Sequence, residues 1–395
     1  MHRRHFIASS LFALTLPRMA AAHVAGFQNW VGGFRRRAQR AGISDRTLDM
    51  AFADVRYLPD SVARDNNQSE FVRPLADYIA TAASETRVRN GRDMLCRHAR
   101  LLAQIDARFD VEPQVVTAVW GMESNYGQRR GDTPLISTLA TLAYDGRRGP
   151  FFETQLVAAL KIVQNGDVEP HNMTGSWAGA MGHTQFIPTS YEAYAVDFTG
   201  DGRRDIWADD PSDALASTAA YFRRFGWRKG QPWGVEVRLP QGFDFGQTAR
   251  AVTRRPSDWA RIGVLGVDRQ PVPDYGGATL STPTGAGGPA FLLFDNYDVI
   301  SRYNNAEAYV IGVGHLSDRI RGAGPLHVAF PADERRLRRA ERRELQQRLT
   351  NAGFSTRGVD GRIGPNSRAA IQAYQRSVGL PADGHPSLAL LQRLR

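Results

Sequence analysis

The chain has 395 residues, of which 42% are hydrophobic and 23% are charged. This length and composition exclude a fibrous or disordered protein and predict two or three domains with a sizeable core. The net charge of +10 is concentrated at the two ends: residues 1–22 carry three arginines and no acids, and residues 333–395 carry 13 arginines and 6 acids. The C-terminal charge indicates a polyanionic partner, unless these arginines form the solvated face of a linker helix.

Residues 1–22 are expected to be a targeting segment that is absent from the mature protein. An arginine pair at residues 3–4 precedes an apolar stretch that reaches Leu16, and three alanines at 20–22 provide a cleavage site. The arginine pair favours twin-arginine export, and the general secretory route is the alternative. No apolar run approaches the ~20 residues that span a bilayer, and Cys96 is too distant to hold a lipid anchor near the cleavage site. We therefore expect a periplasmic protein without a lipid anchor or transmembrane segment.

Helices are predicted throughout residues 23–102. Phe27, Val31 and Phe34 recur with the i, i+4, i+7 spacing of one helix face. Cys96 is the only cysteine of the chain, so an internal disulfide is excluded. Because a free cysteine usually behaves as a small apolar side chain, we expect Cys96 to be buried.

Glu123 is the most informative residue of the next segment, 103–230. The apolar residues after Pro113 have helical spacing, and Asn125 and Gly127 end the helix, which places Glu123 near its C-terminal end. The negative end of the helix dipole and an apolar neighbourhood both disfavour a charged carboxylate, so the pKa rises above about 4.3. Such a carboxyl can act as the general acid of glycosidic cleavage. The alternative is an exposed carboxylate at a helix end.

Residues 231–330 are expected to form a small β-rich lobe followed by a return to helix. The preceding helix begins near Ser212 and ends at Gly226. Frequent glycine and proline, with short β-prone pieces such as 235–239, then distinguish residues 231–290 from the helical segments.

A separate C-terminal module is predicted at residues 333–395. Three short helical segments are joined by Asp-Gly turns at 360–361 and 383–384. This arrangement resembles the type-1 peptidoglycan-binding module. The second turn departs from that family at residues 385–387, where His-Pro-Ser stands in place of a further glycine.

The preceding region resembles the lytic murein transglycosylases of the membrane-bound B type, whose core is similar to goose-type lysozyme. The resemblance runs from Gln68 to Asn304. It is carried by the order and spacing of four segments, at residues 119–127, 176–191, 195–202 and 302–304.

The resemblance implies a carbon-oxygen lyase that cleaves the MurNAc-GlcNAc β-1,4 bond of peptidoglycan. The C6 hydroxyl of MurNAc, rather than water, is then the acceptor, and the product is a 1,6-anhydro sugar. Glu123 is implied to be the catalytic acid and base. The residues implied to line the sugar groove are Tyr78, Ser176, Gln185, Phe186, Tyr221, Tyr303, Asn304 and Tyr309. Aromatic faces stack on sugar rings and amides pair with hydroxyls, although a tyrosine at helical spacing, such as Tyr221, is otherwise a core residue.

An acidic loop at residues 197–205 follows the first nine positions of a calcium loop, with oxygen donors at positions 1, 3, 5 and 9 and glycine at position 6. Position 12 is Ala208, which offers no carboxylate, and the lengthened loop of the B-type enzymes implies Asp213 in its place. The implied ligands are Asp197, Thr199, Asp201, Arg203 and Asp213. A turn held only by Asx hydrogen bonds is equally compatible with the pattern.

Together these features predict a mainly α protein with a lysozyme-like α+β catalytic core, an N-terminal helical region, a small β-rich lobe and a separate three-helix module. The expected boundaries are a signal peptide at 1–22, a catalytic region at 23–330 with lobes at 23–102, 103–230 and 231–330, and a peptidoglycan-binding domain at 333–395.

Only one carboxylate lies in the catalytic motif, whereas most glycosidases use two. We therefore expect a substrate-assisted route in which the N-acetyl oxygen of MurNAc stabilises the cationic centre. One alternative is a muramidase that admits water, with Asp132 or Asp145 as the second carboxylate. Another is a non-catalytic cell-wall binding protein, which the joint presence of Glu123, Gln185 and Asn304 disfavours.

Nucleic-acid binding is disfavoured because the arginine-rich segment lacks interleaved aromatic residues and the chain carries an export signal. No cofactor is expected for the chemistry, and calcium is the one candidate structural ion. The expected partners are the glycan strands of peptidoglycan, and other cell-wall enzymes are candidates.

Overall fold

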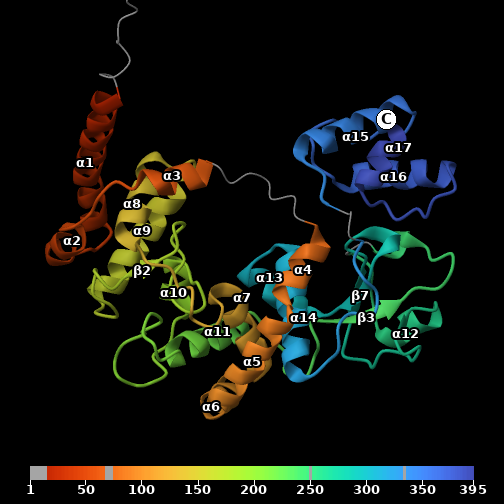
Figure 1. Cartoon of the computed structure of the whole chain (residues 1–395), viewed down its shortest axis with the longest axis horizontal. Helices are drawn as coiled ribbons and strands as arrows, with labels where there is room; N and C mark the ends of the chain where they lie inside the picture. The colour runs from red at the N-terminus through yellow and green to blue at the C-terminus, as the bar shows by residue number, and fades with distance from the viewer. Residues whose placement is uncertain (1–15, 67–73, 249–250, 332–334) are drawn as a thin grey trace, which may run out of the picture. The chain divides into compact units, whose positions relative to one another are not determined.

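The computed structural model describes residues 16–66, 74–248, 251–331 and 335–395, with side chains from Ala25 onward (Figure 1). The arginine pair of the expected export signal and the start of the B-type resemblance at Gln68 lie outside the described residues. Helices dominate the described secondary structure, which confirms the predicted mainly α class. Along these ranges, no helix is both long and apolar enough to cross a membrane.

The chain packs as two compact units, each built from two separate stretches of sequence. Unit 1 comprises Met1–Gln68 and Arg130–Asp213, and unit 2 comprises Ser69–Arg129 and Ala214–Arg395. Residues 103–230 therefore contribute to both units. The lobe boundaries expected from the sequence divide the chain differently and stay a prediction.

Helices α8 and α9 form the centre of unit 1. α1 and α3 pack on α8, whereas α2 and α10 pack on α9. Two short strands, β1 and β2, pair antiparallel with Thr133 opposite Gly175. Ser44 begins α2 by accepting a hydrogen bond from the Thr47 N–H, which satisfies one of the free amides of the first turn. The elements of this unit are α1 (Leu16–Arg40), α2 (Asp45–Phe52), α3 (Pro59–Asn66), β1 (Thr133–Pro134), α8 (Leu135–Asp145), α9 (Gly149–Gln164), β2 (Thr174–Gly175) and α10 (Pro188–Tyr194).

Helix α14 is the central helix of unit 2, and α4, α5, α7 and α13 pack against it. Figure 1 shows α4, α7, α13 and α14 gathered together. Gly312 of α14 lies in tight packing, because a Cβ there would lie 3.1 Å from the Tyr78 ring and 3.3 Å from the Met122 methyl carbon, so these neighbours would have to shift slightly. The helices are α4 (Leu75–Ala82), α5 (Glu85–Arg97), α6 (Ala99–Phe109), α7 (Pro113–Ser124), α13 (Asp295–Tyr303), α14 (Glu307–Arg321) and α11 (Ser212–Arg224), whose first two residues belong to unit 1.

The expectation that Cys96 is buried is wrong. Its side chain is exposed on α5. The inward stripe of this helix contains Val88 and Gly91, which are buried, and Leu95, which is partly buried. Residue 96 lies about 100° further around the helix, so its apolar character does not place it in the core.

Unit 2 also contains the expected β-rich lobe, built on a five-stranded antiparallel sheet in the order β4-β6-β7-β3-β5. Trp259 is fully buried in its core and donates its indole N–H to the Ala278 carbonyl at 3.0 Å. The sheet extends to Leu293, slightly beyond the predicted β-rich segment. The elements are β3 (Gly234–Arg238), η1 (Phe245–Thr248), β4 (Thr253–Arg254), α12 (Pro256–Arg261), β5 (Leu265–Gly266), β6 (Ala278–Ser281), η2 (Gly285–Gly287) and β7 (Ala290–Leu293).

The C-terminal module consists of α15 (Arg339–Asn351), α16 (Pro365–Ser377) and α17 (Leu388–Leu394), as predicted. It has its own apolar core, which includes Leu345, Ile371 and Leu391. These residues are fully buried and come one from each helix. The three short helices are therefore stabilised by burying one shared apolar cluster.

A glutamine holds each Asp-Gly turn of the module in the same way. Gln346 donates to Asp360 at 3.2 Å and accepts the N–H of the following glycine at 2.8 Å. Gln375 donates to Asp383 at 2.6 Å and accepts the N–H of the following glycine at 2.9 Å. The second turn therefore keeps the geometry of the first, although its sequence continues with His-Pro-Ser.

Part of the basic run at residues 335–343 stabilises the module itself. Arg335 forms a bidentate ion pair with Glu341 at 2.6 and 2.7 Å, and this pair is the main reason that the pKa of Glu341 falls to about 2. Arg342 donates to two backbone carbonyls at 2.7 Å each. The run is not one continuous helix, because α15 begins only at Arg339.

Candidate active site

Glu123 lies in the last turn of α7, one residue before the helix ends. Pro113 begins the helix at a position where the missing N–H breaks no hydrogen bond. Asn125 ends it with a left-handed backbone, at φ 51°. These local signals confirm the helix predicted from the sequence and place the carboxyl of Glu123 near the negative end of the helix dipole.

Tyr309 of α14 donates its hydroxyl hydrogen to Glu123 Oε1 at 2.5 Å. The two residues are 186 positions apart in sequence and meet because α14 packs on α7. Tyr309 is 5% exposed, whereas Glu123 is half-buried. The buried Tyr309 hydroxyl therefore holds one carboxyl oxygen of Glu123, while Glu123 itself keeps some solvent-accessible surface.

The electrostatic environment gives Glu123 an unusual pKa. Burial raises the pKa of Glu123 to about 7, and the hydrogen bond from Tyr309 opposes this rise. Burial likewise raises the pKa of Tyr309 well above its usual value, so its hydroxyl remains a donor. Near neutral pH both protonation states of Glu123 are populated. A carboxyl of this kind can donate a proton in one step and accept one in the next.

Three other tyrosines predicted to line the sugar groove also belong to unit 2. Tyr221 is buried, and its hydroxyl donates to the Arg302 carbonyl at 2.7 Å. Its ring meets that of Tyr303 edge to face, with the centroids 5.1 Å apart. Tyr78 and Tyr303 both contribute electrostatically to the raised pKa of Tyr309, so they lie near it. The burial of Tyr221 gives it a packing role in this cluster, and its contact with sugar stays a prediction.

Asn304 is exposed at the end of α13. Its Oδ1 accepts the N–H of Ala306 at 3.0 Å. Ala306 is the N-cap of α14, so this bond fixes the short connection that leads to Tyr309. The structure thus gives Asn304 a positioning role, and its predicted contact with substrate stays a prediction.

The remaining predicted lining residues, Ser176, Gln185 and Phe186, lie in a loop of unit 1 between β2 and α10. Ser176 Oγ accepts a backbone N–H of the loop at 3.1 Å. Gln185 has a left-handed backbone, at φ 56°, and donates its amide to the carbonyls of Arg130 and Gly182 at 3.0 and 2.9 Å. Phe186 is 3% exposed. These contacts stabilise the loop, and the sugar-binding role of the three residues stays a prediction.

The acidic loop of unit 1 uses its carboxylates to bind its own backbone. Asp197 accepts two N–H groups at 2.6 and 2.9 Å and the hydroxyl of Thr199 at 3.2 Å. Asp213 accepts three N–H groups at 2.9, 3.2 and 2.8 Å, and Asp201 accepts that of Arg203 at 2.9 Å. Among the described residues, no three histidine, cysteine or acidic side chains converge as metal ligands. These hydrogen bonds form an Asx-type turn, and calcium binding by the loop stays a prediction.

Two glycines shape the site and were not recognised from the sequence. Gly312 packs closely against α4 and α7, as described above. Gly121 of α7 has the Tyr126 ring directly beside it, because a Cβ there would lie 2.6 Å from that ring. Tyr126 in turn donates to the Arg87 carbonyl at 2.7 Å. The sequence signal that could have identified them is a glycine inside an apolar helical run, which often marks close packing.

Two family matches identify the class of protein to which this chain belongs. The chain belongs to the family of the transglycosylase SLT domain, which matches residues 26–318. Residues 338–394 match the putative peptidoglycan binding domain. Both resemblances predicted from the sequence are thereby confirmed.

Three known proteins show how similar this chain is to individual members of the family. The crystal structure of SltB3 from Pseudomonas aeruginosa in complex with NAG-NAM-pentapeptide is 49% identical, with a TM-score of 0.88 over 93% of this chain and 99% of that chain. The Escherichia coli lytic transglycosylase Slt35, solved in complex with calcium, is 27% identical, with a TM-score of 0.62 over 75% and 93% of the two chains. Membrane-bound lytic murein transglycosylase B of Escherichia coli strain K12 is 34% identical over 219 residues, which are 54% of this chain. The match spans 58% of that curated relative.

Proposed function

We propose that this chain is a periplasmic lytic transglycosylase that cleaves the MurNAc-GlcNAc β-1,4 bond of peptidoglycan and leaves 1,6-anhydro-MurNAc ends. The observation that carries the proposal is the carboxyl of Glu123, which has a pKa of about 7 and a hydrogen bond from Tyr309 in a chain of the SLT family. SltB3 has also been solved in complex with NAG-anhNAM-pentapeptide. Its 49% identity to this chain supports an anhydro product here as well.

The proposed mechanism uses one carboxyl twice. Protonated Glu123 donates its proton to the glycosidic oxygen, and the GlcNAc leaving group departs with that proton. The N-acetyl oxygen of MurNAc stabilises the positive charge that develops at C1. The Glu123 carboxylate then removes the proton of the C6 hydroxyl, whose oxygen bonds to C1. Tyr309 holds the carboxyl in one orientation during both steps, and Glu123 returns to its acid form.

The proposed location follows from the substrate and from the N-terminal sequence. Peptidoglycan lies outside the inner membrane, and the arginine pair and apolar stretch at residues 3–16 support export to that compartment. The twin-arginine route is favoured over the general secretory route by the arginine pair. Peptidoglycan strands are the proposed partner, and other cell-wall enzymes stay candidates.

Products released from purified sacculi test the proposal. We expect every muropeptide released by the wild-type protein to be lighter by one water than its counterpart in a lysozyme digest, because the C6 hydroxyl closes on C1. Mass spectrometry of the two digests measures this difference. Reducing ends alone would establish the muramidase alternative, and the absence of any soluble product would establish a non-catalytic binding protein.

Calcium is expected to raise the melting temperature by binding at Asp197, Asp201 and Asp213, whose carboxylates all accept hydrogen bonds from the backbone of this one loop. A ligand that binds only the native state raises the melting temperature by mass action. Melting of the full chain in millimolar calcium is compared with melting in chelator, and Asp201→Asn serves as a matched variant. We expect a saturable rise in the wild type that Asp201→Asn lacks, and an unchanged midpoint in the wild type at saturating calcium would mean that the loop is only a turn.

A further inference from the structure

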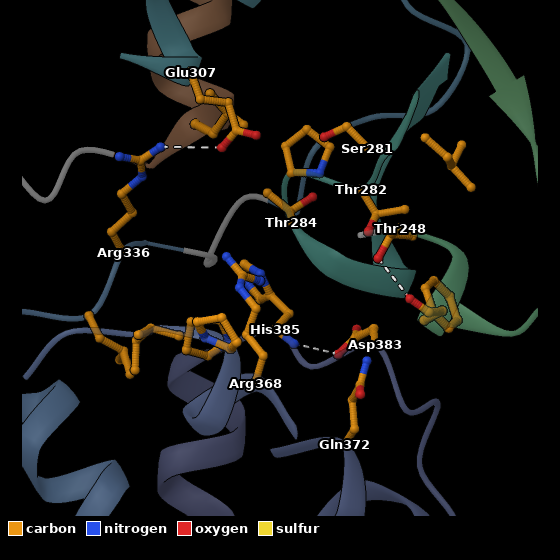
Figure 2. Close-up of a pocket in the computed structure, with 18 of the residues that line it drawn as sticks. Thr248, Ser281, Thr282, Thr284, Glu307, Arg336, Arg368, Gln372, Asp383 and His385 are labelled. Atoms are coloured by element: carbon orange, nitrogen blue, oxygen red, sulfur yellow. Dashed lines mark hydrogen bonds and ion pairs between the residues drawn. The ribbon is translucent and has the colours of Figure 1, made fainter. Parts of the chain in front are cut away.

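A cavity of about 940 Å³ lies in unit 2 between the β-rich lobe and the C-terminal module (Figure 2). The lobe contributes η1 and the end of β6, and the module contributes α16 and both Asp-Gly turns. Glu123 and Tyr309 do not line it. The volume is in the range of cavities that bind small ligands, roughly 300–1,000 Å³.

The second Asp-Gly turn joins the two walls of this cavity. Asp383 of that turn accepts the N–H of Ala286 in the lobe at 2.8 Å. The fit is close, because a Cβ at Gly285 would lie 2.4 Å from an Asp383 carboxylate oxygen, and Gly285 has φ 73°. Arg336 of the linker adds an ion pair to Glu307 at 3.4 Å. The turn whose sequence departs from the family pattern is therefore the one that contacts the lobe.

The module wall carries two arginines, Arg362 and Arg368, whose guanidinium groups make no direct contact with a carboxylate of the described residues, although Arg362 interacts electrostatically with Asp360. Arg362 and Arg368 both line the cavity and are exposed. Within the part of the chain that the structure describes, neither guanidinium forms a hydrogen bond or ion pair, whereas Arg335 is paired with Glu341. His385 also lines the cavity and occupies the position of the second turn that Arg362 occupies in the first.

The lobe wall carries hydroxyl groups instead. Figure 2 shows Thr248, Ser281 and Thr282 on the lobe side, with Arg368 and Gln372 on the module side. Thr284 is 8% exposed, and its hydroxyl has no hydrogen-bond partner among the described residues. A ligand that combines negative charge with amide groups would match both walls, because guanidinium groups pair with carboxylates and hydroxyls pair with amides.

We propose that this cavity binds the carboxylate-bearing peptide arm of peptidoglycan, apart from the glycan site at Glu123. The inference rests on the proposed function, which makes peptidoglycan the substrate. A neutral glycan would leave the charges of Arg362 and Arg368 without partners, whereas a planar carboxylate can accept two hydrogen bonds from one guanidinium. The peptide arm would thus be held while a glycan strand is cleaved at Glu123.

Calorimetry with full-length Glu123→Gln protein, which cannot consume its ligand, tests the proposal. The probes are a pentapeptide stem with free carboxylates, the same peptide with its carboxylates amidated, a neutral N-acetylglucosamine tetramer and inorganic phosphate. We expect the free peptide to bind at least about tenfold more tightly than the amidated peptide, since a hydrogen bond to a charged group contributes about that factor. Phosphate at the same concentration is expected not to displace the peptide.

Substitutions locate the binding site. Arg362→Gln and Arg368→Gln, each made in the Glu123→Gln background, are expected to weaken peptide binding about tenfold and to leave binding of the tetramer unchanged. Arg393→Gln removes one exposed charge from α17 outside the cavity and serves as the matched control. Gly285→Ala is expected to weaken peptide binding too, because its Cβ would meet Asp383 and separate the two walls.

Several outcomes would overturn the inference. Equal binding of the free and amidated peptides would do so, as would cavity variants that behave like Arg393→Gln. Displacement of the peptide by phosphate would show a general anion site instead. If Gly285→Ala has no effect while the arginine variants do, the module binds without the lobe, and the shared cavity is rejected. The wild-type product analysis is independent of these results, so failure here is distinguishable from failure of the proposed function.

Discussion

Glu123→Gln is expected to abolish cleavage of peptidoglycan while leaving glycan binding largely intact. The amide keeps the shape of the side chain and can still accept the hydrogen bond from Tyr309, which is 2.5 Å in the wild type. It cannot deliver a proton to the leaving oxygen. Loss of a positioned general acid costs about 10²–10⁴-fold, and the loss is larger when the same group must later act as the base. Release of soluble muropeptides from sacculi measures the effect.

The control for this substitution is Glu169→Gln, which changes an exposed carboxylate of unit 1 in the same way. We expect this control to release products at the wild-type rate. Binding to sacculi, measured by sedimentation, shows whether Glu123→Gln still recognises the substrate. Near-complete activity of Glu123→Gln would mean that another carboxyl is the acid, and the mechanism proposed above would then be rejected.

Activity is expected to decline at alkaline pH, by about tenfold per unit above pH 7, because Glu123 must be protonated to donate to the leaving oxygen. Burial raises the pKa of Glu123 to about 7, and the Tyr309 hydrogen bond lowers it. Removing that hydrogen bond therefore raises the pKa further. We expect Tyr309→Phe to shift the alkaline limb of the kcat/KM profile to higher pH, in addition to lowering its maximum through poorer positioning of the carboxyl.

Tyr221→Phe is the matched comparison for this profile. Its hydroxyl donates to the Arg302 carbonyl and not to Glu123. The substitution is therefore expected to leave the alkaline limb near pH 7, whatever it does to the maximum. The test is to measure kcat/KM against pH for the wild type, Tyr309→Phe and Tyr221→Phe with one soluble glycan substrate. An alkaline limb that stays in place or moves to lower pH in Tyr309→Phe would show that Tyr309 does not set the pKa of Glu123.

Helix boundaries and turns were predictable because their signals are local. Pro113 and Asn125 determine where α7 begins and ends through their own backbone preferences, and no distant residue is needed. The three-helix module followed in the same way from its Asp-Gly turns. Cys96 shows the limit of this reasoning, because burial depends on the angular position of a residue on α5 and not on its apolar character.

The identity of the hydrogen-bond partners could not be predicted from local pattern. Nothing near Asp383 in sequence indicates that its carboxylate contacts Ala286, 97 positions earlier. In the acidic loop, the spacing of donors left a calcium site and an Asx turn equally compatible. Only the folded loop specifies which backbone amides donate hydrogen bonds to the carboxylates of Asp197 and Asp213.

The sequence by itself determined the class of this protein and the position of the proposed acid, because family motifs and helix-end signals lie in short stretches such as residues 119–127. The tertiary structure alone decided the environment of that carboxyl. Tyr309 is 186 residues away and reaches Glu123 only because α14 packs on α7, where Gly312 lies in tight packing. Burial then raises the pKa to about 7. A pKa depends on how much water and charge surround a group, and that surrounding exists only after distant segments have packed together.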